Sequence, residues 1–246
     1  GQGVTKNRVE AVKWYHKAAE QGNVTAQSNL GIMYRAGIGV AKNDAESIRW
    51  QTKAANQGHK KSMRSLANKY HKGYGTSINM SQAIKWYKKL AGTGDKEAMS
   101  ELADLYYDGK DVPKNYAQAA KWVRKLADKG NSRYQGRLGY MYQEGLGVSK
   151  SQAQAIKWYR KVAGNRYIFD SYKSRFAQNQ LGVMYAHGEG VAKDNIKAYY
   201  WLSVAADKGN KKSAESIKVL EGRMTAAQIQ EAKSWVKSCT ESLKMY

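Results

Sequence analysis

The sequence predicts an all-α solenoid made of about six antiparallel helix pairs and one C-terminal helix. Three observations predict it: a tryptophan-centred pattern recurs at a fixed step, a helix-capping residue precedes each tryptophan, and glycines mark the helix ends. The tryptophans are Trp14, Trp50, Trp86, Trp122, Trp158 and Trp201, separated by 36 residues four times and then by 43. A fixed period in this range is typical of solenoids, in which each unit packs on its neighbours.

The first helix of each unit is predicted to begin seven residues before its tryptophan. The residues there are Asn7, Asn43, Asn79, Asn115, Ser151 and Asp194, whose side chains can accept hydrogen bonds from the free N–H groups of a first turn. Glu or Gln follows three residues later in five of the six units, which predicts a reciprocal capping box. The helix is amphipathic, with Trp14 and Ala18 on the predicted buried face and His16 on the solvent face.

The second helix of each unit follows a glycine turn and carries a leucine followed by a small residue. The leucines are Leu30, Leu66, Leu102, Leu138 and Leu181. The small residue is expected to let two helix backbones come close. Each of these helices ends at a glycine, which accepts the left-handed conformation that closes a helix. We interpret the tryptophans and tyrosines as core, because they repeat at helix-pair spacing.

The C-terminal segment predicts one further helix. Thr225 and Gln228 form a capping box, and Ile229, Ala232 and Trp235 share one face that can cover the last repeat. The predicted organisation is a solenoid over residues 1–224, with an insertion at about 164–176, and a capping helix and tail over 225–246. Because residues 1–4 lie in the register of 37–40, we expect the chain to begin within a repeat, with further sequence upstream.

The chain is strongly basic, with 42 Lys and Arg against 20 Asp and Glu and a net charge of +22. Such a charge favours acidic partners, namely nucleic acid, anionic lipid, a polyanionic glycan or an acidic protein, or else serves solubility. No run of about 18 apolar residues exists, so no transmembrane segment is predicted. Cys239 is the one cysteine, which excludes an intramolecular disulfide and leaves the compartment open.

An enzyme is the function class that the sequence supports least. The four histidines are His16, His59, His71 and His187, and none has a histidine partner at metal-ligand spacing. Cys239 has no histidine near it in the sequence and is interpreted as a packed residue. We therefore predict no catalytic residue, no metal site and no cofactor.

The repeated motifs resemble the Sel-one-like repeat family, a relative of the tetratricopeptide repeats. The resemblance rests on W-Y-H-K-A-A at Trp14, L-G-I-M-Y at Leu30, G-I-G-V at Gly37 and their later copies. It implies a right-handed superhelix with a concave inner surface and a role as an adaptor or partner-binding protein. Members are often bacterial and exported, so a periplasmic or secreted location is favoured, with a cytoplasmic one still open. The chain lacks the cysteines of disulfide-bonded members and keeps the family's loop proline only at Pro113.

A basic ladder is the first candidate binding site. Each of the first five repeats has a cation immediately before its tryptophan and another three residues after it, so both leave the same helix face. The ladder consists of Lys13, Lys17, Arg49, Lys53, Lys85, Lys89, Lys121, Lys125, Lys157 and Lys161. Glu10 and Glu46 can offset the like-charge repulsion in the first two repeats. The alternative interpretation is an ordinary solvated face.

The insertion is the second candidate binding site. It contains Arg166, Tyr167, Phe169 and Tyr172, a mixture of aromatic and basic residues that suits protein hot spots or base stacking. The alternative is that these aromatic residues fold back on the solenoid as a longer helix or a buried turn.

These observations favour a non-catalytic adaptor or scaffold that captures another protein on its concave surface, through an acidic or mixed segment. The alternative is a non-specific polyanion binder, with nucleic acid, anionic glycan or lipid headgroups as ligand. Salt dependence distinguishes the two, because a polyanion complex loses affinity steeply as salt rises.

Overall fold

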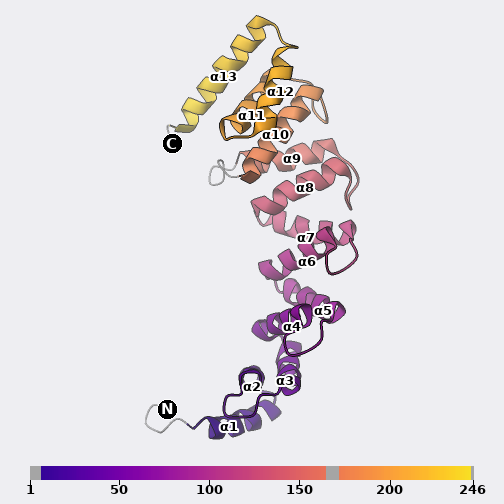
Figure 1. Ribbon diagram of the computed structural model, residues 1–246, viewed down its shortest axis with the longest axis vertical. Helices are drawn as coiled ribbons and strands as arrows, with labels where there is room; N and C mark the ends of the chain where they lie inside the picture. The colour runs from indigo at the N-terminus through magenta and orange to yellow at the C-terminus, as the bar shows by residue number, and fades with distance from the viewer. Residues whose placement is uncertain (1–6, 165–171, 245–246) are drawn as a thin grey trace. The chain divides into compact units, whose positions relative to one another are not determined.

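The computed structural model describes residues 7–164 and 172–244, which divide into two compact units, Gly1–Lys114 and Asn115–Tyr246. Within these described residues every regular element is an α-helix, and the helices follow one another as pairs (Figure 1). The all-α repeat solenoid predicted from the sequence is confirmed. The predicted division at residues 224 and 225 stays a prediction.

The first unit contains three helix pairs. They are α1 (Arg8–Glu20) with α2 (Val24–Ala36), α3 (Asp44–Asn56) with α4 (Lys60–Lys72), and α5 (Met80–Gly92) with α6 (Lys96–Asp108). Each helix packs on the next along the chain, so α2 lies between α1 and α3, and α4 lies between α3 and α5.

The second unit contains three further pairs and the terminal helix. They are α7 (Tyr116–Asp128) with α8 (Ser132–Glu144), α9 (Gln152–Ala163) with α10 (Tyr172–His187), and α11 (Asn195–Asp207) with α12 (Lys211–Glu221), followed by α13 (Ala226–Lys244). Helix α13 packs on α11, where the rings of Trp235 and Tyr200 lie 4.8 Å apart and Ala232 is buried. This terminal helix is in the place that its capping box predicted.

The predicted N-caps are present, and four of the six make a backbone bond that the sequence did not show. The side chain of Asn43 accepts a hydrogen bond from the backbone N–H of Glu46 at 3.0 Å. The Asn43 N–H itself donates to the carbonyl of Tyr34 in the preceding helix at 2.9 Å, instead of to the Glu46 side chain. Equivalent bonds join Asn79 to Tyr70, Ser151 to Tyr142 and Asp194 to Tyr185. The reciprocal capping box is complete at α13, between Thr225 and Gln228.

The core consists of leucines from the second helices and of alanines and aromatic residues from the first. Leu30, Leu66, Leu102, Leu138 and Leu181 are fully buried. The small residue after each leucine admits the neighbouring first helix: a Cβ added at Gly139 would lie 2.7 Å from the ring of Tyr159 on α9.

The prediction that every repeat tryptophan is core is wrong for Trp14. Trp50, Trp86 and Trp158 are buried, but Trp14 is 61% exposed. Trp50 packs on the first helix of the preceding repeat, where its ring centroid lies 5.4 Å from that of His16. In the described part of the chain no helix precedes α1, so Trp14 has no such neighbour.

The placement of His16 on a solvent face is also corrected. Its side chain is half-buried, and its Nε2 lies 2.9 Å from the Tyr34 hydroxyl. His16 therefore joins α1 to α2 and to Trp50, because the two faces of α1 are both partly covered.

The insertion lengthens α10 at its start. This helix begins nine residues before Leu181, whereas α2 and α4 begin six residues before their leucines. Phe176 is half-buried and meets the ring of Tyr159 edge-on at 6.0 Å, so this part of the insertion packs on the solenoid. Arg166, Tyr167 and Phe169 lie outside the described residues. Tyr172 begins α10, and its side chain is likewise outside what the structure describes.

Candidate protein-binding face

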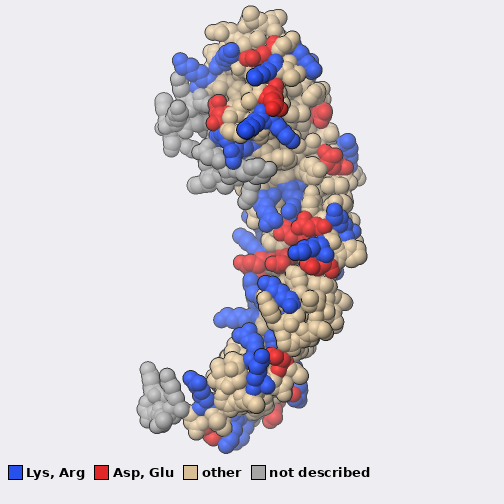
Figure 2. Space-filling view, in the orientation of Figure 1, with Lys and Arg blue, Asp and Glu red and all other residues tan. Residues whose placement is uncertain are grey.

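The basic ladder lies on the first helices of five repeats. In the first unit it occupies α1, α3 and α5, and in the second unit α7 and α9. All ten of its side chains are exposed. Figure 2 shows Lys and Arg distributed over both units, with fewer Asp and Glu among them. These exposed cations are available to a partner, and their role in binding stays a prediction.

The second cation of each ladder pair lies over the tryptophan of its own repeat. The distances from Nζ to the ring centroid are 4.7 Å for Lys17 on Trp14, 4.4 Å for Lys53 on Trp50, 4.8 Å for Lys89 on Trp86, 4.7 Å for Lys125 on Trp122 and 4.1 Å for Lys161 on Trp158. Cation–π contacts of this kind contribute about 0.5–1 kcal/mol at exposed sites. The contact therefore covers the indole while leaving the ammonium open to solvent on its other side.

The first cation of each pair divides the repeats into two groups. Lys13 pairs with Glu10 at 3.4 Å and Arg49 with Glu46 at 3.1 Å, as the sequence predicted. Lys85, Lys121 and Lys157 have Gln at the corresponding place, and no described carboxylate forms an ion pair with them. The positive charges of these three lysines are therefore not offset by an ion pair in the described structure.

A third cation in each of these same repeats was missed from the sequence. It stands two residues after the tryptophan, and it lies over a tyrosine of the second helix. The pairs are Lys88 with Tyr106 at 5.8 Å, Arg124 with Tyr142 at 5.5 Å, and Arg160 with Tyr185 at 5.7 Å. The sequence signal was available, because the first two repeats have His16 and Thr52 at this position.

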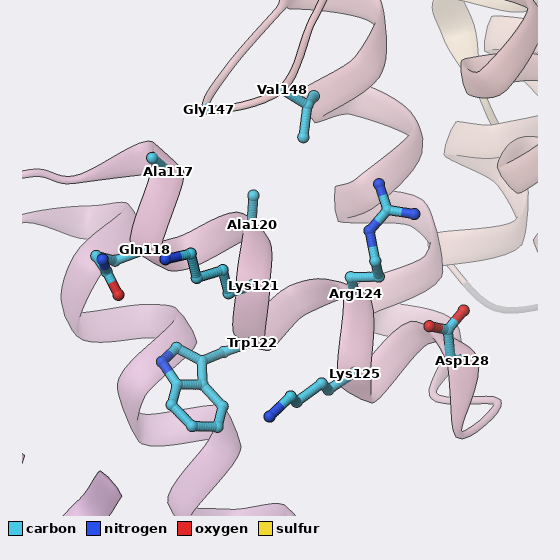
Figure 3. A pocket seen from close by; sticks show the side chains of 10 residues that line it. All are labelled: Ala117, Gln118, Ala120, Lys121, Trp122, Arg124, Lys125, Asp128, Gly147 and Val148. Carbon is cyan, nitrogen blue, oxygen red and sulfur yellow. The ribbon is translucent and has the colours of Figure 1, made fainter.

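The Trp122 pocket, a cavity of about 530 Å³, adjoins the ladder in the fourth repeat. It is lined by Ala117, Gln118, Ala120, Lys121, Trp122, Arg124, Lys125 and Asp128 of α7 with Gly147 and Val148 of the next loop (Figure 3). Lys121 and Lys125 flank Trp122 in this view, and the Arg124 guanidinium extends toward Val148. Three cations thus border an apolar floor, with Asp128 as the one acidic lining residue.

Ala120 accounts for the space in this pocket. It stands two residues before Trp122, where the second, third and fifth repeats have Ile48, Ile84 and Ile156. The methyl group of Ala120 fills less volume than an isoleucine side chain, and this leaves the floor of the pocket hollow. Comparing the repeats at this position would have revealed the difference from sequence alone.

Metal and membrane sites were also sought within the described residues. No group of three or more His, Cys, Asp or Glu in 7–164 and 172–244 is arranged to hold a metal ion. None of the helices in these ranges combines the length and the apolar character needed to cross a membrane.

The Sel1 repeat matches the chain six times, at residues 1–23, 24–59, 60–94, 96–131, 132–163 and 175–210. These matches cover most of the sequence, and the chain belongs to the Sel1 repeat family. The Sel1 repeat fold is commonly a protein-interaction scaffold, and members of the family are generally non-catalytic. No protein with curated function matches the chain.

Two solved structures are similar to the chain over most of its length. A Sel1 repeat protein from Oxalobacter formigenes shares 32% identity with a TM-score of 0.53, over 84% of this chain and 85% of that one. A protective antigen present in uropathogenic Escherichia coli strains, displaying an SLR fold, shares 29% identity with a TM-score of 0.55 over 97% of this chain. The match spans 58% of the length of the Escherichia coli protein.

Proposed function

We propose that the chain is a non-catalytic adaptor that captures an acidic segment of a partner protein on the face formed by the first helices of its repeats. The resemblance to the family implies a concave inner surface, and in this proposal the ladder lines part of it. The observation that carries the proposal is the Trp122 pocket, where an apolar floor and the cations of the ladder occur together. In an acidic peptide that also has an apolar side chain, the carboxylates match the cations and the apolar side chain matches the floor of the pocket.

The proposed capture has two stages. The cations of the third to fifth repeats attract the acidic segment over long range, which speeds encounter more than it tightens the complex. An apolar side chain of the partner then enters the Trp122 pocket, and its carboxylates contact Lys121, Arg124 and Lys125. The aromatic residues of the insertion, Tyr167 and Phe169, would add specificity.

A polyanion binder needs charge alone, whereas the pocket supports a ligand with an apolar part. Peptides selected from a random display library against the whole chain provide a defined probe. Selection of sequences that combine acidic and apolar residues supports the adaptor. At about 1 M salt, charges are screened over about 3 Å. Tight binding of heparin and single-stranded DNA, together with loss of every selected peptide at that salt concentration, would contradict the adaptor.

Charge reversal of the ladder tests the site directly. Changing Lys121, Lys125, Lys157 and Lys161 to Glu should weaken the selected peptide by more than tenfold, about 1.4 kcal/mol or more. Changing Lys150, Lys193, Lys211 and Lys218 to Glu alters the net charge equally, and these four are exposed outside the ladder. Binding is measured by titration calorimetry, and helicity by circular dichroism. Equal loss in both variants would show that net charge, and not the ladder, binds the peptide.

A further inference from the structure

Lys69 is a buried lysine at a position where the other repeats have apolar residues. It stands three residues after Leu66 in α4, and the corresponding residues are Met33, Leu105, Met141 and Met184. Its side chain is 3% exposed, and among the described residues it is the one buried residue that carries a charge. Lysine is rarely buried to this extent without a counter-charge.

The ammonium of Lys69 is only partly satisfied by the protein. Its Nζ donates to Ser47 Oγ at 2.7 Å, and Ser47 in turn donates to the carbonyl of Gly31 at 2.6 Å. An ammonium has three donors, and this contact uses one. Burial lowers the pKa of Lys69; Asp44 of α3 acts against the shift, and Arg35 of α2 adds to it. Asp44 is itself paired with Lys42 at 3.6 Å.

Lys69 also lines a cavity of about 370 Å³, here called the Lys69 pocket. Its other lining residues are Arg35, Lys61, Arg64, Ser65, Asn68 and Tyr74. Four cations therefore surround this space, and no carboxylate lines it. Ser65, Asn68 and Tyr74 add neutral hydrogen-bonding groups.

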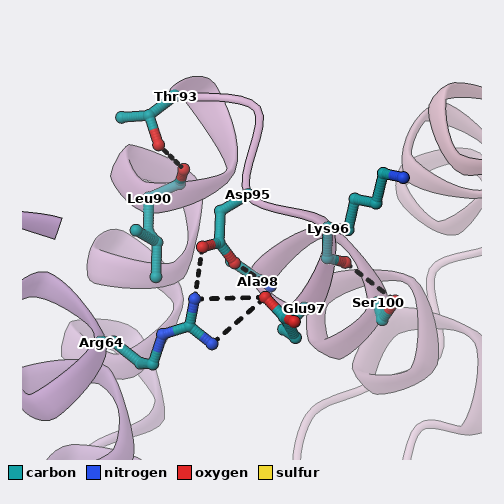
Figure 4. A network of polar contacts seen from close by, with 8 residues as sticks. All are labelled: Arg64, Leu90, Thr93, Asp95, Lys96, Glu97, Ala98 and Ser100. Carbon is teal, nitrogen blue, oxygen red and sulfur yellow. Dashed lines mark hydrogen bonds and ion pairs between the residues drawn. The ribbon is translucent and has the colours of Figure 1, made fainter. Parts of the chain in front are cut away.

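Arg64, one of the cations that line the cavity, is held in place by two carboxylates. Its guanidinium bonds Asp95, the N-cap of α6, and Glu97 at 3.2 Å (Figure 4). These two carboxylates fix the guanidinium and offset part of its charge. The positive charges of Arg35, Lys61 and Lys69 have no described acidic partner within ion-pair distance.

We propose that the Lys69 pocket binds a phosphate monoester. Arginine and lysine side chains together form the donor set that phosphate oxygens prefer. The volume lies at the lower end of the range of about 300–1,000 Å³ for small-molecule pockets, so it accommodates a phosphate group with part of the organic moiety attached to it. A doubly charged oxyanion would also supply the counter-charge that buried Lys69 lacks. This site is formed by α2, α4 and Tyr74 just after α4, and it is independent of the proposed adaptor function.

The phosphate group could belong to a small metabolite or to a phosphorylated side chain of a protein, and one set of probes separates the two. We would titrate the whole chain with inorganic phosphate, O-phosphoserine, serine, and a short peptide with a central phosphoserine. Phosphate and phosphoserine should bind and serine should not. If the phosphoserine peptide binds at least tenfold more tightly than O-phosphoserine, the phosphate belongs to a protein. If the two bind with equal affinity, it belongs to a small ester.

The variant Lys69→Met restores the residue type of the other repeats, so it is expected to fold. It should lose at least tenfold in phosphoserine affinity, and it should lose the part of the phosphate-induced rise in Tm that exceeds the rise in sodium chloride of the same ionic strength. Lys72→Met removes the same charge from an exposed residue of the same helix and should keep both. Arg35→Gln, at an exposed lining residue, should weaken binding without touching the core.

Each outcome of these experiments either supports the proposed phosphate site or overturns it. Loss of phosphoserine binding in Lys69→Met and Arg35→Gln, with binding kept in Lys72→Met, supports the site. No saturable binding of phosphate or phosphoserine by the unaltered chain overturns it, as does equal binding by Lys69→Met. A Tm that rises equally with phosphate and with sodium chloride of the same ionic strength also overturns it.

Discussion

At the scale of single residues, the most informative positions are those where one repeat has a different type of side chain from the other repeats. Lys69 and Ala120 each stand at a position where most other repeats have a larger or more apolar side chain. One departure places a charge in the core, and the other opens a pocket beside Trp122. Both could be seen in an alignment of the repeats, but burial and cavity volume required the packed structure.

The two glycines of α8 give a prediction at this scale. A Cβ added at Gly139 would lie 2.7 Å from Tyr159 Cε1, whereas one added at Gly136 meets nothing within 4 Å. Gly139→Ala should therefore lower the free energy of unfolding by about 1–3 kcal/mol, because the overpacked helices must separate. Gly136→Ala should raise it by about 0.5–1 kcal/mol, because alanine costs less entropy in a helix. Urea denaturation of the two variants measures both effects, and destabilisation by both would contradict the packing argument.

At the scale of elements, four junctions between helix pairs have a bond from the N-cap N–H of the first helix to a tyrosine carbonyl of the preceding helix. The spacing from Tyr34 to Asn43 and from Tyr70 to Asn79 is the same, which fixes how the chain leaves one helix and enters the next. The sequence predicted these caps because side-chain capping is local. It could not predict the backbone bond, because a carbonyl carries no residue-specific signal.

The Asn79 cap gives a prediction for one element. Its side chain accepts from the N–H of Gln82 at 3.0 Å, and α5 has no acidic residue in its first turn. Asn79→Ala should lower the free energy of unfolding by about 1 kcal/mol, because it leaves an N–H unsatisfied. Asn79→Asp should match or exceed the parent stability, because it keeps the acceptor and adds a favourable interaction with the helix dipole. Thermal unfolding followed by circular dichroism distinguishes them, and no loss in Asn79→Ala would mean that the backbone bond to Tyr70 alone holds this junction.

At the scale of the whole molecule, most of the fold followed from the sequence, because a solenoid is specified by short-range contacts repeated along the chain. Leu30 and its equivalents were predicted to be core and are fully buried. Trp14 was predicted wrongly because its burial depends on a neighbouring helix and not on its own repeat. The candidate site was only partly visible: the ladder could be placed on helices, but its cation–π contacts and the Trp122 pocket depend on side-chain geometry.

The net charge of +22 gives the prediction that belongs to the whole chain. Like charges repel more strongly in the folded state than in the expanded chain, so self-repulsion lowers stability. Sodium chloride shortens the Debye length from about 10 Å at 0.1 M to about 3 Å at 1 M and should therefore raise the Tm. A gain of 1 kcal/mol corresponds to about 2–4 °C for a chain of this size. The two fourfold Lys-to-Glu variants carry less charge, so both should show a smaller rise, measured by differential scanning calorimetry. A Tm that falls with salt would mean instead that ion pairs such as Arg64 with Asp95 and Glu97 outweigh the repulsion.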